Sequence, residues 1–281
     1  TWGIIPMAVC AVVSYFCGRL IHRFADKKGL KRLWLILSVV ANMAVLLVFI
    51  RSGHSNYDVT SIFTGKGAML KLFPVWGAGV FTLHGISYCM DIYRKEIEPE
   101  KNFLLVSQYI CFFPCFSCGP ILRFSDMSEQ LRKPVITSGK LAEGIKLMLI
   151  GFAEKLFLSD PMYEMWHHIR GVSADSLSAA CAWLGIIAFS FAFYYELRAY
   201  SHIAQGIGSM LGFELPDNFD LPFMSAGFNE LIKRFACTFY SWVRDYFYRP
   251  ICRNKDSVCL WALILSVLAG SVWYGYRSEE H

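Results

Sequence analysis

Three ionisable side chains lie within two helical turns of one another at the end of an apolar stretch. Glu196, Arg198 and His202 follow the apolar run 177–195. Charged groups near membrane depth are costly unless they pair with one another or line a wet cavity. Histidine titrates near neutral pH, so His202 is a candidate general base. The group therefore indicates either a local structural ion pair or the polar wall of a tunnel.

A second charged group lies in the aromatic-rich stretch 228–250. Its apolar residues recur at intervals of three and four, which predicts one face of an amphipathic helix. Arg244 and Asp245 fall largely on the other side, and Pro250 is expected to end the helix. The almost uncharged run 257–276 then follows and is long enough to cross a bilayer. The pattern predicts an interfacial anchor before a membrane span, or a site built at the membrane boundary.

Other polar residues are embedded in apolar segments. His84 lies within the run 70–93, where a hydrogen-bonded histidine at a helix interface is the first interpretation and a catalytic role is the alternative. Glu154 and Lys155 lie in the run 143–159. They cannot face lipid cheaply, so we expect them at a boundary or pointing inward.

Histidine and cysteine spacings do not predict a metal site. Cys111, Cys115 and Cys118 share a helical spacing, but no histidine or carboxylate lies close to them in the sequence. His167 and His168 are expected in a loop, and adjacent histidines on a helix would point apart. We predict no metal and no bound cofactor.

The composition predicts an integral membrane protein. The 281 residues are 55% hydrophobic and only 17% charged, whereas a soluble domain carries about 25% charged residues. The net charge of +5 is distributed over short loops beside apolar runs, so no nucleic-acid partner is expected. The ten cysteines lie mostly inside apolar runs and suggest buried thiols rather than a disulfide framework.

About seven hydrophobic segments are predicted. The basic loop 19–32 is expected on the cytoplasmic side because positive loops face inward. The segment 103–118 is short, is broken by Pro114 and has basic flanks on both sides, which predicts a re-entrant or tilted segment. The segments are residues 3–21, 33–50, 70–93, 103–118, 143–159, 177–195 and 257–276.

Five short motifs occur in order along the chain. They read I-S-Y-C-M-D-I-Y-R at 86–94, F-F-P-C-F-S-C-G-P-I-L-R-F-S-D at 112–126, L-G-F-E-L-P-D-N-F-D-L-P-F at 211–223, W-V-R-D-Y-F-Y-R-P at 242–250 and S-V-W-Y-G at 271–275. Together they resemble the membrane-bound O-acyltransferase family, in particular its bacterial branch of alginate O-acetyltransferase type. The resemblance implies an all-α, polytopic membrane protein with re-entrant or tilted helices and interfacial amphipathic helices around a central tunnel.

Two positions depart from the family pattern. The histidine that precedes the W-x-R-D-Y motif falls on Ala236, and the histidine of the family's W-H-G motif falls on Tyr274. A further family motif, Y-F-D-F-S-G-Y-S-D, is comparable to the residues around 195–202. Glu196 keeps the acid of this motif, whereas Arg198 and His202 depart from it.

The resemblance implies transfer of an acyl group, acetyl in that branch, from a thioester donor similar to acetyl-CoA. The acceptor would be a hydroxyl of an extracytoplasmic polysaccharide or carrier, and the W-H-G histidine would take its proton. A tyrosine with a pKa near 10 is about a thousandfold under-ionised at pH 7, so Tyr274 is a poor base. Tyr274 could instead donate a hydrogen bond to a developing oxyanion.

Three hypotheses follow. The first is an acyltransferase with a relocated base, for which His202 and His84 are the nearest candidates, or with a base in a carboxyl-terminal part that is expected to follow this piece. The second is an inactive relative that binds lipid or thioester and assists a partner. The third is a transporter or channel, which the charged residues near membrane depth would also fit. The expected catalytic positions are Tyr274 and His202, and the expected tunnel or substrate positions are Arg123, Glu196, Arg198, Asn218, Arg244, Asp245 and Trp273.

The expected setting follows from the same resemblance. The chain is predicted to be one membrane-embedded domain over residues 1–281 and the central piece of a longer protein, in a bacterial cytoplasmic membrane. Its expected partners are membrane lipid, the acyl thioester donor and an extracytoplasmic acceptor or transfer protein. Glu196, Arg244 and Tyr274 are predicted to converge on one hollow.

Overall fold

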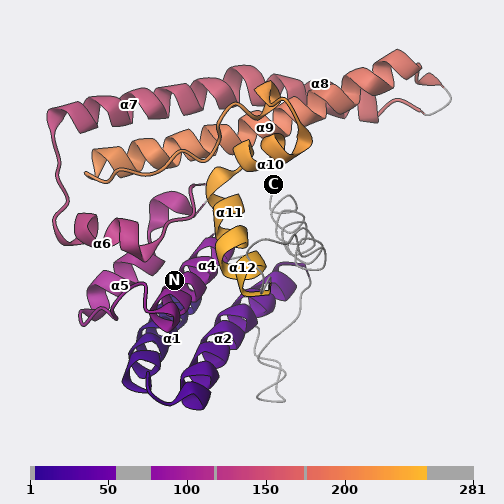
Figure 1. Ribbon diagram of the computed structural model, residues 1–281. Helices are drawn as coiled ribbons and strands as arrows, with labels where there is room; N and C mark the ends of the chain where they lie inside the picture. The colour runs from indigo at the N-terminus through magenta and orange to yellow at the C-terminus, as the bar shows by residue number, and fades with distance from the viewer. Residues whose placement is uncertain (1–3, 55–76, 117–118, 174–175, 252–281) are drawn as a thin grey trace, which may run out of the picture. The chain divides into compact units, whose positions relative to one another are not determined.

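The computed structural model describes residues 4–54, 77–116, 119–173 and 176–251, and all regular secondary structure in these ranges is helical (Figure 1). This confirms the all-α prediction. The elements are α1 (Ile4–Arg23), α2 (Lys28–His54), α4 (Ala78–Arg94), α5 (Phe103–Ile110), η1 (Phe113–Cys115), α6 (Phe124–Arg132), α7 (Ser138–Ala153), η2 (Glu154–Ser159), α8 (Asp160–Arg170), α9 (Ala179–Met210), η4 (Pro222–Met224), α10 (Phe228–Arg234), α11 (Cys237–Trp242), η5 (Val243–Tyr248) and α12 (Arg249–Ile251).

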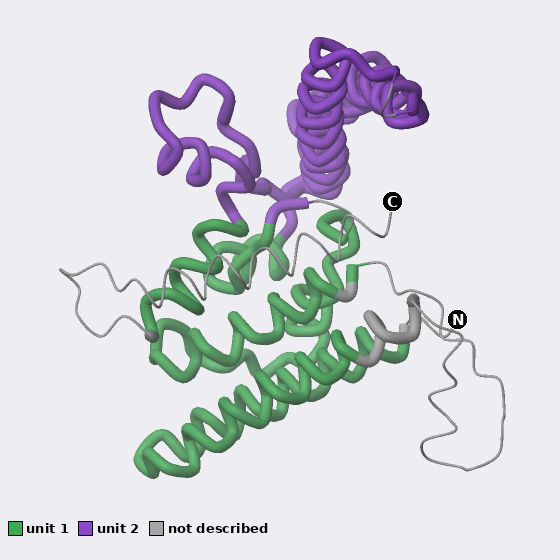
Figure 2. The backbone as a smooth tube through the Cα atoms, turned by 90° about the vertical axis from the view of Figure 1, so that its right-hand side faces the viewer, with its two compact units in different colours: residues 1–116, 121–133, 239–281 green, residues 117–120, 134–238 purple. Residues whose placement is uncertain are grey.

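The chain forms two compact units, which Figure 2 shows in different colours. Unit 1 contains residues 1–116, 121–133 and 239–281, and unit 2 contains residues 117–120 and 134–238. Each unit is described by itself below. The expectation of one membrane-embedded domain stays a prediction.

The three helices α1, α2 and α4 pack against one another in unit 1. Lys31, in the first turn of α2, places its ammonium group 4.5 Å from the ring centroid of Tyr93, near the end of α4. The basic loop between α1 and α2 therefore lies at the same end of this bundle as the last turn of α4. This is the arrangement expected for a chain that leaves the basic side of a membrane in α2 and returns to it in α4.

Three helices of the described residues are long and apolar enough to cross a membrane: Ile5–Arg23, Lys28–Leu47 and Ala179–Met210. They coincide with the predicted spans 3–21, 33–50 and 177–195, although α9 continues well beyond the predicted end. The predicted span 70–93 is described only from residue 77 onward, and the predicted span 257–276 lies outside the described residues.

The segment 103–118, predicted to be too short for a full span and broken at Pro114, has these features in the structure. Helix α5 has eight residues, which corresponds to about 12 Å, less than half of a hydrocarbon core of about 30 Å. It ends at Ile110, and Pro114 occupies the following single turn η1. A helix of this length cannot span a bilayer.

Unit 2 is built on the close packing of α7 against α9, which lie side by side in Figure 1. A Cβ added to Gly144 of α7 would lie 2.6 Å from the carbonyl oxygen of Gly206 in α9. One added to Gly151 would lie 2.7 Å from the carbonyl oxygen of Ala199. Small residues seven positions apart on each helix therefore let the two backbones approach closely, as is common between membrane helices.

Two π-helical turns precede prolines. The turn η2 is followed by Asp160 and Pro161, and the turn η5 by Arg249 and Pro250. The N–H of Asp160 donates to the carbonyl of Lys155, and the N–H of Arg249 to that of Arg244, five residues back in each case. Because a proline ring clashes with the carbonyl four residues before it, the preceding turn widens instead of breaking.

The prediction that Pro250 ends the helix is therefore wrong. The helical backbone continues through Pro250 to Ile251 in α12. The widened turn η5 accommodates the proline ring.

The prediction of one amphipathic helix over 228–250 is also wrong. Helix α10 ends at Arg234, Phe235 is extended, and Ala236 has a left-handed backbone with φ 53° before α11 begins. The N–H of Cys237 donates to the carbonyl of Asn218 at 2.7 Å, so the loop before α10 takes a donor that a continuous helix would use internally. Tertiary hydrogen bonding overrides the helical pattern here.

The adjacent histidines, His167 and His168, lie in helix α8 and not in the predicted loop. Pro161 follows the π-helical turn η2, which accommodates its ring, and the helical backbone continues into α8. The side chain of His168 is exposed.

We predict that Gly144→Ala lowers the free energy of unfolding by about 1–3 kcal/mol, because the new methyl group forces two helix backbones apart. Gly139→Ala in the same helix is the matched control, since a Cβ there would meet only the Thr137 hydroxyl at 3.9 Å. Thermal unfolding of the protein in detergent measures both. Equal stability of the two variants would contradict the close-packing interpretation.

Candidate functional site

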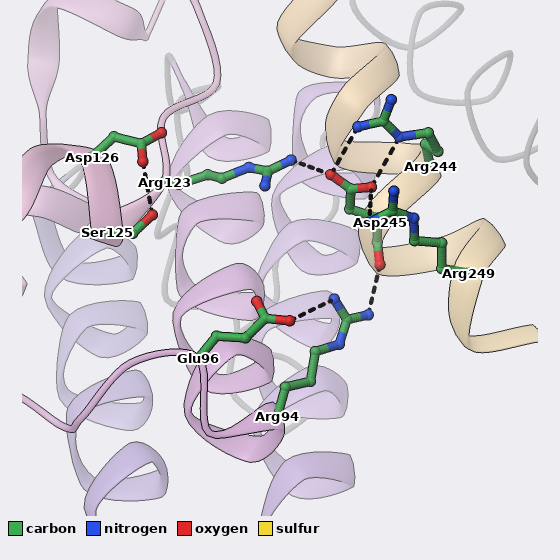
Figure 3. Close-up of polar contacts among 8 residues, drawn as sticks. All are labelled: Arg94, Glu96, Arg123, Ser125, Asp126, Arg244, Asp245 and Arg249. Carbon is green, nitrogen blue, oxygen red and sulfur yellow. Dashed lines mark hydrogen bonds and ion pairs between the residues drawn. The ribbon is translucent and has the colours of Figure 1, made fainter.

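The buried carboxylate of Asp245 forms ion pairs with three guanidinium groups in unit 1 (Figure 3). Arg123 pairs with it from the start of α6. Arg244 donates to its two oxygens at 2.9 and 3.2 Å, and Arg249 pairs with it at 3.1 Å. We call Arg94, Arg123, Arg244, Arg249 and Asp245 the arginine cluster.

The electrostatics of Asp245 favour its charged form. Burial disfavours ionisation, but the hydrogen bonds from Arg244 and Arg123 outweigh this effect and lower the pKa of the carboxyl below its ordinary value. The side chain of Asp245 is 6% exposed, whereas those of Arg244 and Arg249 are 43% and 63% exposed. The carboxylate therefore holds the inner ends of guanidinium groups that also reach solvent.

Arg94 completes the arginine cluster through the backbone. The carbonyl of Asp245 would accept from the N–H of residue 250 if the π-helical pattern continued, but Pro250 has no N–H. The guanidinium of Arg94 donates to this carbonyl at 2.6 Å. Arg94 and Arg123 also lie 5.3 and 5.7 Å from the ring centroid of Tyr246.

A buried polar network fixes the position of Arg123. The N–H of Leu122 donates to Nε2 of His84 at 3.2 Å, and the carbonyl of Leu122 accepts from the hydroxyl of Tyr109 at 2.9 Å. The ring of His84 stacks on that of Tyr109. His84 is fully buried, and its contacts support the structural interpretation of this residue.

The second group of charges lies in unit 2, where η2 packs against α9. Oε2 of Glu154 is 2.8 Å from Nδ1 of His202, and Oε1 of Glu154 is 3.3 Å from Nε of Arg198. The ammonium of Lys155 is 2.8 Å from Glu196 and 2.7 Å from Asp160. We call these six residues the α9 charge network.

The α9 charge network is largely enclosed within unit 2, and Asp160 is its most exposed member at 43%. The side chain of Glu154 is 10% exposed and that of Lys155 is 25% exposed. This agrees with the prediction that neither residue faces lipid. The ion pair that the sequence suggests between Glu196 and either Arg198 or His202 is wrong, because Glu196 pairs with Lys155 while Glu154 takes the other two.

The remaining expected site residues are distributed as follows. Asn218 is buried, and its side-chain oxygen accepts from the hydroxyl of Thr238 at 2.6 Å. Trp273 and Tyr274 lie outside the described residues. Glu196 and Arg244 belong to different units, so the hollow expected around them and Tyr274 stays a prediction.

Sequence reasoning did not name five members of these groups as site residues: Arg94, Glu154, Lys155, Asp160 and Arg249. Arg94 stands inside the quoted motif at 86–94, and Arg249 stands beside Pro250, but neither position indicates a role. Glu154 lies 48 residues before His202, so no local spacing connects them. Within the described residues, no three His, Cys, Asp or Glu side chains are placed to hold a metal ion.

Comparison with known proteins gives a family and several relatives. The sequence model of the membrane-bound O-acyltransferase family, MBOAT, matches residues 36–279. The probable alginate O-acetylase AlgI of Pseudomonas aeruginosa is 30% identical over 271 residues, which cover 94% of this chain and 52% of the relative. The peptidoglycan O-acetyltransferase of Helicobacter pylori is 26% identical over 306 residues, which cover 98% and 58%.

A more distant relative is the teichoic acid D-alanyltransferase of Streptococcus thermophilus, 23% identical over 222 residues that cover 73% of this chain and 53% of the relative. The chain thus spans about half the length of the curated relatives it matches.

We predict that Arg94→Met lowers the free energy of unfolding by about 1–3 kcal/mol, because it leaves the buried carbonyl of Asp245 without a donor. Pro250→Ala returns an N–H at the position five residues on. The effect of Arg94→Met should therefore be smaller in the Pro250→Ala background. A double-mutant cycle from thermal unfolding measures this coupling, and strictly additive effects would contradict the role assigned to Arg94.

The lowered pKa of Asp245 predicts a specific acid sensitivity. The carboxylate contributes stability that is complete above its unfolded pKa near 3.9, and that is lost as pH falls through the lower folded value. Asp245→Asn removes this contribution, so the stability gap between the two proteins should be largest at neutral pH and shrink in acid. Unfolding midpoints at pH 7 and pH 3 test it, and a gap that widens in acid would contradict it.

Proposed function

Since the chain belongs to the membrane-bound O-acyltransferase family, we propose that the protein of which it is part transfers an acyl group from a thioester donor to a hydroxyl of an extracytoplasmic polysaccharide. The relatives named as alginate and peptidoglycan O-acetylating proteins favour acetyl as the group and a glycan as the acceptor. A carrier that relays the acyl group is the alternative acceptor. The bacterial relatives favour the cytoplasmic membrane as its location.

The observation that carries the donor proposal is the arginine cluster. A guanidinium group has five N–H donors. Arg249 forms one ion-pair contact with Asp245 and its side chain is 63% exposed, so other donors of this group can reach a ligand. Planar guanidinium groups suit phosphate oxygens, which they bind in pairs of hydrogen bonds. We therefore assign to this cluster the phosphate groups of a donor similar to acetyl-CoA.

The position of the cluster within unit 1 supports the same assignment. Arg94 ends α4, and the contact of Lys31 with Tyr93 puts this end beside the basic loop between α1 and α2. Positive loops face the cytoplasm. A phosphate-bearing thioester is a cytoplasmic metabolite, so donor and cluster would meet on the same side of the membrane.

Ala236 and Tyr274 support a second candidate function, a non-catalytic partner that binds the donor or lipid. Both stand where the family pattern has histidine, and Ala236 is 2% exposed in a left-handed backbone conformation. A methyl group cannot exchange a proton. In this case the arginine cluster would still bind the donor.

Acyl transfer by the full-length protein in vesicles, from a labelled acetyl thioester to a glycan acceptor, tests the proposal. Product formation supports it. Absence of transfer, unchanged when Tyr274→His and Ala236→His are introduced together, supports the non-catalytic partner instead. Ion flux through the same vesicles without transfer supports the transporter hypothesis.

We predict that Arg249→Ala raises the KM for acetyl-CoA about tenfold, equivalent to about 1.4 kcal/mol of lost binding, and leaves kcat within about twofold. Transfer from a short acetyl thioester without phosphate should not change. Arg23→Ala is the matched control, because Arg23 is an exposed arginine at the end of α1 in the same unit. An equal rise in KM for both donors would contradict phosphate binding at this cluster.

A further inference from the structure

His202 has the surroundings of an oriented proton acceptor. Its Nδ1 is 2.8 Å from Oε2 of Glu154, and the Glu154 side chain is 10% exposed. A carboxylate that accepts from Nδ1–H fixes the ring orientation and the tautomer, and it stabilises the imidazolium that forms when Nε2 takes a proton. Within the described residues, no group is hydrogen-bonded to Nε2 of His202.

The local structure holds the pair in place. Glu154 begins the π-helical turn η2, and His202 lies in α9, with which η2 packs. Such turns are frequent at functional sites. The side chain of His202 is 18% exposed, so the ring is largely enclosed but not sealed.

The charges around the pair are balanced. Glu154 also pairs with Arg198, whose guanidinium donates to the hydroxyl of Tyr194 at 3.4 Å. Next to this group, Lys155 is held between Glu196 and Asp160. Arg198 therefore gives the buried carboxylate a partner charge that does not depend on the histidine.

Three other described histidines, His84, His167 and His168, do not offer the same combination. Nε2 of His84 is committed to the N–H of Leu122, and the residue is fully buried. His167 and His168 lie in α8 with exposed side chains, and no carboxylate is paired with either in the described part of the chain.

We propose that His202, oriented by Glu154, is the general base of the acyl transfer, in place of the histidine that the family has at position 274. This inference rests on the proposed function. Nε2 of His202 takes the proton of the acceptor hydroxyl while the hydroxyl oxygen bonds to the carbonyl carbon of the thioester. The tetrahedral intermediate then collapses, the C–S bond breaks, and the leaving thiolate takes the proton from the imidazolium. The products are an ester and a thiol.

The test compares kcat and KM of full-length variants in vesicles with a labelled acetyl thioester. We expect His202→Ala to lower kcat at least about a hundredfold, the range of general-base catalysis, with little change in the KM for the donor. Glu154→Gln keeps the shape but not the charge, and it should lower kcat about tenfold. His168→Ala, an exposed histidine in the same unit, should keep full activity.

Added imidazole separates a base from a structural histidine. Partial recovery of kcat in His202→Ala with imidazole supports the proposal, because the free base occupies the space of the lost ring. Loss of activity that imidazole does not restore, or unchanged activity in His202→Ala, overturns it and leaves the proposed function standing. Absence of transfer in the unmodified protein overturns the proposed function first, and this inference with it.

Discussion

Pro250 removes one hydrogen-bond donor from the helix at the end of the described chain, and a contact between α4 and the turn η5 of unit 1 compensates for that loss. The backbone before it widens into the π-helical turn η5, and the guanidinium of Arg94 donates to the carbonyl of Asp245 that the proline leaves unserved. The same arginine belongs to α4, so a local backbone defect becomes a tertiary link between two elements far apart in sequence. A neutral side chain could also donate a hydrogen bond to the carbonyl of Asp245. Only a charged donor such as Arg94 adds a positive charge to the arginine cluster as well.

Unit 2 uses the same device with a different result. Pro161 follows the π-helical turn η2, and this turn begins with Glu154 and Lys155, which face α9. In a regular α-helix the side chains of Glu154 and Lys155 would point about 100° apart. It would then be harder for both of them to pair with residues of α9. The two turns differ in charge balance. Around Asp245 arginines outnumber the carboxylate they surround, which suits an anion, whereas the α9 charge network pairs its charges and leaves one imidazole nitrogen available.

The sequence predicts the parts of this fold that depend on composition over long windows. Apolar length places α1, α2 and α9, and the break at Pro114 limits α5, because bilayer thickness and proline act locally. The break at Ala236 depends on the hydrogen bond from the N–H of Cys237 to the carbonyl of Asn218, 19 residues before Cys237, and the helical pattern of 228–250 does not indicate it. The pairing of Glu154 with His202 could not be predicted from the sequence either. Hydropathy indicates that both residues lie near apolar segments, but it does not indicate which charged residues pair.

Position 236, where the resemblance to the family leads us to expect a histidine, differs physically from position 202. At position 236 the backbone is left-handed and the side chain is enclosed, so an imidazole there would have to displace packed neighbours and tolerate an uncommon φ. At position 202 the backbone is a regular helix and a carboxylate is already in place on Nδ1. If proton transfer is part of what this chain does, the packing of unit 2 favours position 202, where the ring needs no further rearrangement to act.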